Sequence, residues 1–273
     1  MSRSAKTCSK YESKQCRSKT MHLFDVAKLQ VSSLISDAWN RAQKAGKSVA
    51  GLPAGSVEIP RNPALGDFAA THVLAARTQM QGLSPQDAAR IFAEYIELEG
   101  SYFSSFSVSE SGFINFTLSG EWYSQVLQTA EPAECANTAP KSAPKPNYGR
   151  KDKENPDYFI RYACERIHKI TSILAAEGIC VNDGCCANTD LLETCYERGL
   201  IKQIAQTPDR AYLYSAQCDR EKRFKYAYEL AEKFYRFYYN CRIIGAQPPL
   251  AQARLKLAKT ASSAICRCMD DDR

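Results

Sequence analysis

Apolar residues recur at helical spacing in the first patterned part of the chain. They return at three- and four-residue steps between residues 23 and 45, and Gly46 ends the run. Such a repeat is typical of an amphipathic helix. We therefore predict a helix over 23–45, a short strand over 56–60 with Val57 and Ile59 on one side, and a second helix over 67–80.

Alternating residues follow a clear helix start. Ser84-Pro85-Gln86-Asp87 combines a capping serine, a first-turn proline and an acid, which together predict the beginning of a helix. Residues 102–108 and 112–118 alternate between apolar and polar types, with Ser-Gly between them. This pattern predicts a β-hairpin, and a short helix over 121–127 completes the unit.

From residue 155 onward the pattern is helical. Breaks at glycine and proline divide it into expected helices over 156–176, 189–206, 219–244 and 248–268. The helix over 219–244 has the best-defined apolar stripe. Its members are Phe224, Ala227, Ala231, Phe234, Tyr238 and Cys241.

Between these two regions lies a stretch without apolar periodicity. Residues 129–154 are rich in proline, alanine, serine and lysine, which is typical of an exposed linker. The expected fold class is therefore α+β. A small N-terminal α/β domain over 21–128, with helices packed on a short antiparallel sheet, is linked to an all-α helical bundle over 155–273.

The positive charge is concentrated at one end. The chain of 273 residues has a net charge of +6, and residues 1–20 hold six basic residues against one acid, 6 − 1 = +5. We expect this segment to be a disordered tail, which either solubilises the chain or seeks phosphate. No apolar run reaches the roughly 18 residues of a membrane helix, and no secretory signal follows the basic start, so we expect a cytoplasmic protein.

The twelve cysteines do not predict a metal site. Cys180, Cys185, Cys186 and Cys195 cluster, but they do not form the paired C-x2-C spacing that zinc favours. No glycine-rich phosphate cradle occurs either. We therefore expect neither a metal ion nor a cofactor.

Motifs in the first region are similar to those of a known family. Residues 57–63 (Val-Glu-Ile-Pro-Arg-Asn-Pro) and 66–69 (Gly-Asp-Phe-Ala) resemble the opening of the N-terminal additional domain of arginyl-tRNA synthetases. Residues 112–116 (Gly-Phe-Ile-Asn-Phe), followed by Leu118 and Trp122, resemble the end of that domain.

Motifs in the second region resemble the helical anticodon-binding domain of the same family, called the DALR domain. Residues 155–158 (Asn-Pro-Asp-Tyr), together with Tyr162 and Arg166, resemble its first helix. Residues 241–244 (Cys-Arg-Ile-Ile) and 253–257 (Ala-Arg-Leu-Lys-Leu) resemble its central and final helices. The two sets of motifs occur in the order that the family uses.

One departure from the family bears on catalysis. In arginyl-tRNA synthetases a large domain that binds ATP and arginine lies between these parts, whereas here only the expected linker does. The His-Ile-Gly-His and Lys-Met-Ser-Lys types of signature are absent. We interpret the chain as an RNA-binding protein without ligase activity, because adenylation needs preorganised groups around the triphosphate.

The resemblance implies contacts to the outer corner of tRNA. The matching positions are Phe113, which could stack on an unstacked base, and Asn115, which could read its edge. Arg61 and Asn62 could touch phosphate. The alternatives are a core phenylalanine, a polar group of the hairpin and a solvated turn.

The helical region supplies candidates for the anticodon side. Residues 220–242 hold seven basic and three acidic side chains, 7 − 3 = +4, interleaved with aromatic residues. Such a surface suits a phosphate backbone with unstacked bases. The candidates are Tyr158, Tyr162, Arg166, Arg223, Lys233, Arg236 and Tyr239. The alternative is a solvated helix whose tyrosines pack against neighbouring helices.

Three functions remain open at this stage. The first is a non-catalytic tRNA-binding protein that prefers tRNA-Arg. The second is a protein-interaction or regulatory paralogue of the synthetase, with a partner in the translation machinery. The third, an arginine–tRNA ligase, conflicts with the missing catalytic core.

Overall fold

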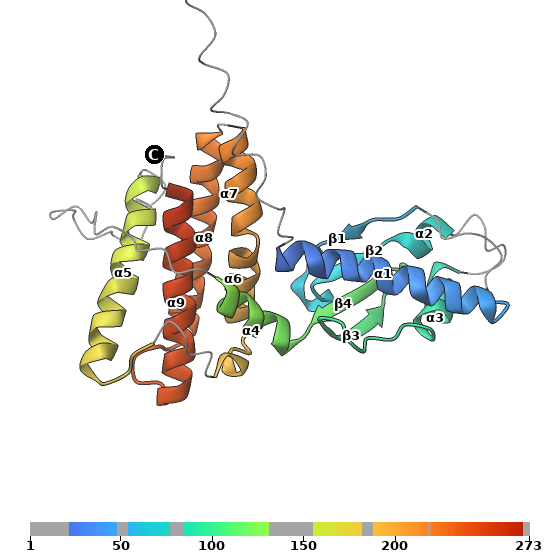
Figure 1. Cartoon of the computed structure of the whole chain (residues 1–273), viewed down its shortest axis with the longest axis horizontal. Coiled ribbons are helices and arrows are strands. Elements are labelled where there is room, and N and C mark those ends of the chain that lie inside the picture. The colour runs from blue at the N-terminus through green and yellow to red at the C-terminus, as the bar shows by residue number, and fades with distance from the viewer. Residues whose placement is uncertain are drawn as a thin grey trace, which may run out of the picture.

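A computed structural model describes residues 22–47, 54–76, 84–130, 155–181, 188–217 and 219–269. The expected basic tail over 1–20 and nearly all of the expected linker lie outside these residues. The described chain forms a small sheet-containing unit and a helical bundle that lie side by side (Figure 1). The expected α+β class is confirmed.

The N-terminal unit is built on a four-stranded antiparallel sheet with the order β1-β2-β4-β3. Aromatic contacts fasten α1 to this unit: Phe24 lies 5.3 Å from Phe68 of the sheet, and Trp39 stacks on Phe92 of α3 at 4.4 Å between ring centroids. The strands are β1 (Val57–Glu58), β2 (Phe68–Ala70), β3 (Phe103–Val108) and β4 (Ile114–Leu118), and the helices are α1 (Leu23–Lys44), α2 (His72–Ala76) and α3 (Pro85–Ala93).

The hairpin and the start of α3 are as predicted. Strands β3 and β4 pair antiparallel, and the Ser84 hydroxyl accepts a hydrogen bond from the Asp87 amide at 3.1 Å. The predicted helix over 67–80 is wrong in its first part, because residues 68–70 form β2. All three are buried and pair with β4, so long-range pairing overrides the local helical pattern.

The bundle contains five α-helices and one short 3-10 helix among the described residues. Two expected helices have almost the predicted bounds. The elements are α5 (Pro156–Ala176), η3 (Thr189–Leu191), α6 (Cys195–Ala205), α7 (Thr207–Ala216), α8 (Arg220–Asn240) and α9 (Pro248–Met269). Helix α7 was not expected, because Pro208 was interpreted as a break, whereas it occupies the first turn of α7, where proline is tolerated.

A buried ion pair ties three helices of the bundle together. The Glu197 carboxylate, which is fully buried, accepts a hydrogen bond from Arg254 Nε at 2.7 Å and completes the capping box of α6 with Thr194. Arg254 also donates to the Arg242 carbonyl oxygen at 2.6 Å. Arg254 of α9 therefore holds both the start of α6 and the end of α8.

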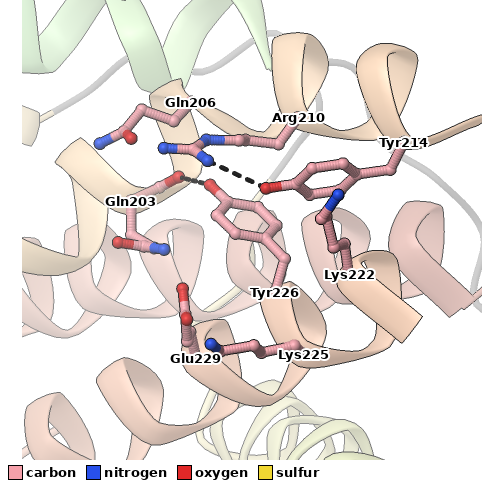
Figure 2. A pocket seen from close by; sticks show the side chains of 8 residues that line it. All are labelled: Gln203, Gln206, Arg210, Tyr214, Lys222, Lys225, Tyr226 and Glu229. Carbon is pink, nitrogen blue, oxygen red and sulfur yellow. Dashed lines mark hydrogen bonds between the residues drawn. The ribbon is translucent and has the colours of Figure 1, made fainter. Parts of the chain in front are cut away.

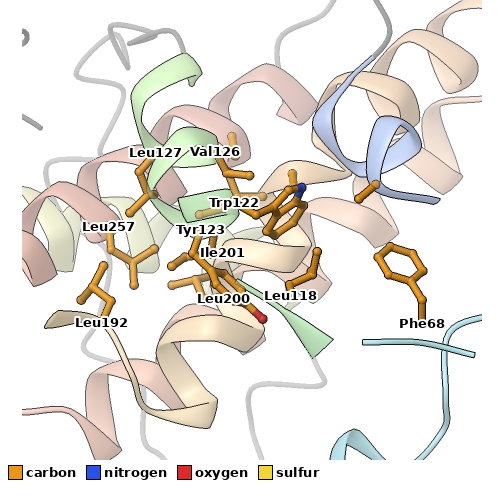
Figure 3. Packing of buried hydrophobic residues seen from close by; sticks show 14 of the residues in the cluster. Phe68, Leu118, Trp122, Tyr123, Val126, Leu127, Leu192, Leu200, Ile201 and Leu257 are labelled. Atoms are coloured by element: carbon orange, nitrogen blue, oxygen red, sulfur yellow. The ribbon is translucent and has the colours of Figure 1, made fainter. Parts of the chain in front are cut away.

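The two units share one hydrophobic core through helix α4 (Gly120–Thr129). Trp122 and Tyr123 are buried near the sheet, and the Trp122 indole donates to the Leu23 carbonyl oxygen at 3.1 Å. At the other end of α4, Leu127 lies by Leu192 and Leu257 of the bundle (Figure 3). The chain thus folds as two units joined by a common helix.

A polar contact accompanies this apolar junction. Asp67, beside β2, forms an ion pair with Lys202 of α6 at 2.5 Å, and the side chain of Asp67 is only 7% exposed. Its carboxylate also accepts the Leu118 amide at 2.7 Å and the Tyr123 hydroxyl at 3.4 Å. The Arg198 guanidinium lies 5.4 Å from the centroid of the Tyr123 ring.

Replacing Lys202 by methionine should lower the free energy of unfolding by roughly 1–3 kcal/mol, because a buried carboxylate loses its cation. Chemical denaturation followed by circular dichroism measures the change. The matched control is Lys169→Met, whose ammonium pairs with Glu165 on the surface of α5. That control should cost no more than about 0.5 kcal/mol. Equal stabilities of the two variants would contradict a structural role for the Asp67–Lys202 pair.

Candidate nucleic-acid interface

Four tyrosines from α5 and α8 form a row, which we call the tyrosine row. Tyr158 stacks on Tyr162 at 6.0 Å, Tyr162 on Tyr235 at 6.4 Å, and Tyr235 on Tyr239 at 6.3 Å between ring centroids. The interplanar angles are 26°, 17° and 25°. Residues four apart on a helix share a face, so each helix contributes two neighbouring rings to one surface.

An arginine lies against this row. The Arg166 guanidinium carbon is 5.9 Å from the Tyr162 ring centroid and 5.3 Å from that of Tyr238. Arg166 is one turn beyond Tyr162 on α5, so the same face of the helix presents both groups. Cations at this distance are attracted by the electron-rich ring faces, and the rings in turn orient the guanidinium.

The row is anchored at its centre and accessible at its ends. Tyr235 exposes 6% of its surface and packs on Phe159 at 4.7 Å, whereas Tyr239 is 60% exposed. Tyr158 and Tyr162 are half-buried. Rings that already pack on neighbouring side chains lose little conformational freedom when a further flat group stacks on them.

Helix α8 exposes one charged stripe, which we call the α8 stripe. Its members recur at three- and four-residue steps and end at the tyrosine row, and all except the half-buried Glu229 are exposed: Lys222, Lys225, Glu229, Glu232, Arg236 and Tyr239. Lys233 is half-buried beside it, and Arg236 pairs with Glu232 at 2.7 Å. Exposed ion pairs of this kind contribute at most about 1 kcal/mol, so phosphate can compete with the carboxylate for such an arginine.

Eight residues of α8 are buried, which changes two sequence-based assignments. Arg223 is 8% exposed and lies near Cys268 of α9. Burial raises the pKa of Cys268 to about 12, and the charge of Arg223 opposes this rise. Tyr226 and Phe237, placed off the core stripe in the sequence, are buried as well. Because α8 packs against α5, α6, α7 and α9, its apolar face is wider than a single stripe.

The N-terminal candidates fall into two groups. Arg61 is exposed and Phe113 is half-buried, at the start of β4. Asn115 is only 3% exposed in the centre of the sheet, opposite Ala69 and Ser107. Asn62 accepts a hydrogen bond from the Ala64 amide at 3.0 Å. The Asn115 side chain is therefore too buried here to contact a ligand, and the Asn62 side chain already stabilises a turn.

The described residues form neither a metal-binding cluster nor a membrane-spanning helix. No group of three or more histidine, cysteine, aspartate or glutamate side chains there is arranged to hold a metal ion. None of the described helices is long and apolar enough to cross a bilayer.

Comparison with known families matches both halves of the chain. Residues 160–270 match the DALR anticodon binding domain, and residues 29–118 match the arginyl tRNA synthetase N terminal domain. The two matches occur in this order along one chain, and they coincide with the bundle and with the sheet unit. The chain is related to the arginyl-tRNA synthetases.

Curated relatives of this synthetase-related chain are named arginine–tRNA ligases. The proteins from Geobacter metallireducens and Moorella thermoacetica are 36% and 33% identical over 41% and 39% of the chain. The protein from Ruminiclostridium cellulolyticum is 28% identical over 44% of it. These matches cover 20%, 19% and 22% of the relatives, so the synthetase-related chain spans about a fifth of their length.

The two matched segments of the synthetase-related chain lie close together in sequence. Residues 119–159 separate them, which is 159 − 118 = 41 residues. The described part of this interval consists of α4 and the beginning of α5. A compact domain typically needs at least about 50 residues, so the interval is too short for an inserted domain.

Arg223 is buried and Arg236 is exposed, so we expect their replacement to change the stability of the fold by different amounts. Arg223→Gln should lower the free energy of unfolding by roughly 1–3 kcal/mol, because buried groups around the guanidinium lose their partner. Arg236→Gln should change it by less than about 0.5 kcal/mol, as is usual at the surface. Thermal denaturation of both variants tests this. If Arg236→Gln proved the more destabilising change, the assigned positions of these side chains would be incorrect.

Proposed function

We propose that the chain is a non-catalytic RNA-binding protein that holds tRNA, with a preference for tRNA-Arg. The observation that carries this proposal is the tyrosine row with Arg166 beside it. The match to an anticodon-binding domain favours the same surface, because α8 and all of α5 after its first four residues lie within the matched segment. A cytoplasmic location, where tRNA occurs, belongs to this proposal.

Stacking supplies the main contact with the bases. Every base has a flat π face, and stacking on an aromatic side chain contributes about 1–3 kcal/mol per base. Tyr239 is the most exposed ring of the row, so it offers a platform for a base that leaves the helical stack of the RNA. Arg166 can stack on a neighbouring base or bind the adjacent phosphate.

Charge supplies attraction to the backbone. Helices α5 and α8 together carry nine basic and five acidic residues, 9 − 5 = +4. Arg161 on α5 and Arg236 on α8 are exposed and are paired with acids four residues away. Binding would therefore release counterions from the RNA and weaken as the salt concentration rises.

The sheet unit provides a second surface for the same RNA. Arg61 and Phe113 remain the candidates for contact with the tRNA corner, since both reach the surface at least in part. The junction through α4 would hold this surface at a set distance from the tyrosine row. A folded RNA of matching shape would then meet both surfaces at once, whereas an unstructured strand would not.

The absence of catalysis rests on the short interval between the matched segments. In the relatives' family the nucleotide-binding domain occupies that place, and 41 residues cannot form it. The only sheet among the described residues is the four-stranded antiparallel one, without parallel strands of the nucleotide-binding type. An ATP–pyrophosphate exchange assay with arginine should give no turnover, and clear turnover would overturn this part of the proposal.

Binding to tRNA-Arg should weaken about 5- to 150-fold in Tyr239→Ala, which corresponds to the loss of one stacked base. Arg166→Lys should also weaken binding, because the charge stays but the planar group that lies along the rings is lost. Fluorescence anisotropy at two salt concentrations measures both. The control is Tyr196→Ala, which removes a tyrosine that is 41% exposed on α6 and does not belong to the tyrosine row.

The measurements test three points separately: the preference for tRNA-Arg, the surface that binds, and RNA binding itself. Equal affinity for all tRNAs would remove the preference for tRNA-Arg but leave RNA binding intact. Equal affinity of Tyr239→Ala, Tyr196→Ala and the natural chain would show that the tyrosine row is not the binding surface. No binding to any tRNA, combined with recovery of a stable RNase-insensitive protein complex, would favour the regulatory alternative.

A further inference from the structure

A polar cavity opens at the other end of the α8 stripe. Its volume is about 370 Å³, and it lies between the end of α6, helix α7 and the first half of α8. Figure 2 shows Arg210 and Tyr214 on one side of it and Tyr226, Lys225 and Glu229 on the other. Ligand pockets in proteins begin at about 300 Å³, so the cavity has room for a small ligand.

The inner side of the cavity is held by a buried phenol. Tyr226 is 4% exposed, and its hydroxyl donates to the Gln203 carbonyl oxygen at 2.6 Å. Burial is the main cause that raises the pKa of Tyr226, so the hydroxyl stays protonated at neutral pH. The ring is therefore a fixed, neutral wall that joins α8 to α6.

Cations line the opposite side and the rim. Arg210 donates to the Tyr214 hydroxyl at 2.9 Å, a contact that raises the pKa of Arg210 and directs its guanidinium along the cavity. Lys222 is paired with Asp219 at 2.7 Å. Lys225 forms no ion pair with any residue that the structure describes, so its charge is available to an incoming anion.

The remaining lining groups favour a ligand that carries hydrogen-bonding groups in addition to a negative charge. The side-chain amide of Gln203 can donate and accept hydrogen bonds, as the edge of a nucleobase requires. The amide of Gln206 donates to the Lys202 carbonyl oxygen at 3.3 Å and retains its oxygen and a second N–H for such an edge. The Glu229 carboxylate can accept from an exocyclic amino group, and it repels a chain of several phosphates. A base with one phosphate satisfies amides, carboxylate and cations together.

We propose that this cavity holds one unstacked nucleotide, with its base against Gln203, Gln206 and Glu229 and its phosphate against Arg210 and Lys225. This inference rests on the proposed RNA binding and adds a second site to it. Lys225 and Arg236 are 11 residues apart on one helix, about 16 Å along its axis, and both belong to the α8 stripe. One RNA strand could therefore run from the cavity along α8 to the tyrosine row.

The chemistry leaves two sources for such a ligand, a nucleotide within RNA and a free mononucleotide. The first arm of the test titrates the labelled full chain with CMP, AMP, GMP and UMP, with inorganic phosphate and cytidine as comparisons, and follows amide signals by NMR. We expect at least one mononucleotide with an amino-bearing base to shift the signals of residues 203–229 more strongly than phosphate or cytidine does at the same concentration. An equal response to phosphate alone would overturn the nucleotide site in favour of an anion site.

The second arm measures tRNA affinity for Lys225→Gln and Gln206→Ala. Each should weaken binding at least about fivefold, the loss expected for a hydrogen bond to a charged or buried group. The matched control is Lys44→Gln, an exposed lysine at the end of α1, outside the cavity and outside both α5 and α8. Circular dichroism of each variant verifies the fold, and because Lys225 is exposed, its replacement should leave the bundle intact.

The two proposals fail in different ways. If Tyr239→Ala weakens tRNA binding while Lys225→Gln and Gln206→Ala do not, the cavity is not part of the RNA path and this inference is overturned. If the mononucleotide signals appear and Lys225→Gln abolishes them, while Tyr239→Ala leaves tRNA affinity unchanged, the cavity stands and the tyrosine row does not. If residues 203–229 respond neither to any mononucleotide nor to tRNA, the cavity binds neither a free nucleotide nor a nucleotide within RNA, and the inference is overturned.

Discussion

The burial of helix α4 is the contact on which the rest of the arrangement depends. Its ten residues belong to the sheet unit in sequence, yet Leu127 completes the core of the bundle beside Leu192 and Leu257. Four large side chains on one short helix, each buried to at least 96%, represent several kcal/mol of apolar burial. Asp67 and Lys202 add a directional polar contact, which apolar packing lacks, and so set how the units are rotated relative to each other.

Helix α8 imposes a second constraint, which concerns function. It packs against four other helices, so one side of it is buried and the α8 stripe faces the solvent. Buried aromatic rings such as Phe234, Phe237 and Tyr235 make this helix a stiff support. The polar groups that do reach the surface are therefore held at regular intervals. A support of this kind lowers the ordering entropy that a ligand must overcome, and each contact then contributes more to affinity.

The sequence predicts those features that depend on local patterns. Helices α5 and α9 and the β3–β4 hairpin could be placed within a residue or two, because their periodicity and caps are strong. Strand β2 and helix α7 could not, since residues 68–70 become a strand only by pairing with β4, and a proline in a first turn looks like a break. Among the candidate site residues, the shared face of Tyr158 and Tyr162 follows from their four-residue spacing, whereas their alignment with Tyr235 and Tyr239 depends on how α5 packs on α8. The burial of Arg223 and Asn115 likewise depends on which elements cover them.

The junction between the two units would also affect how an RNA binds to both of them. With two units on a free linker, the second contact forms at an effective concentration set by the length of that linker. Here the two units share a core, so α4 sets their relative position. The second contact then does not require one unit to diffuse on a linker. Rigid spacing increases discrimination between folded RNAs, because an RNA of the wrong shape can satisfy only one surface and loses the binding free energy of the other. Specificity for tRNA could thus arise from the packing of a buried helix that itself need not touch the RNA.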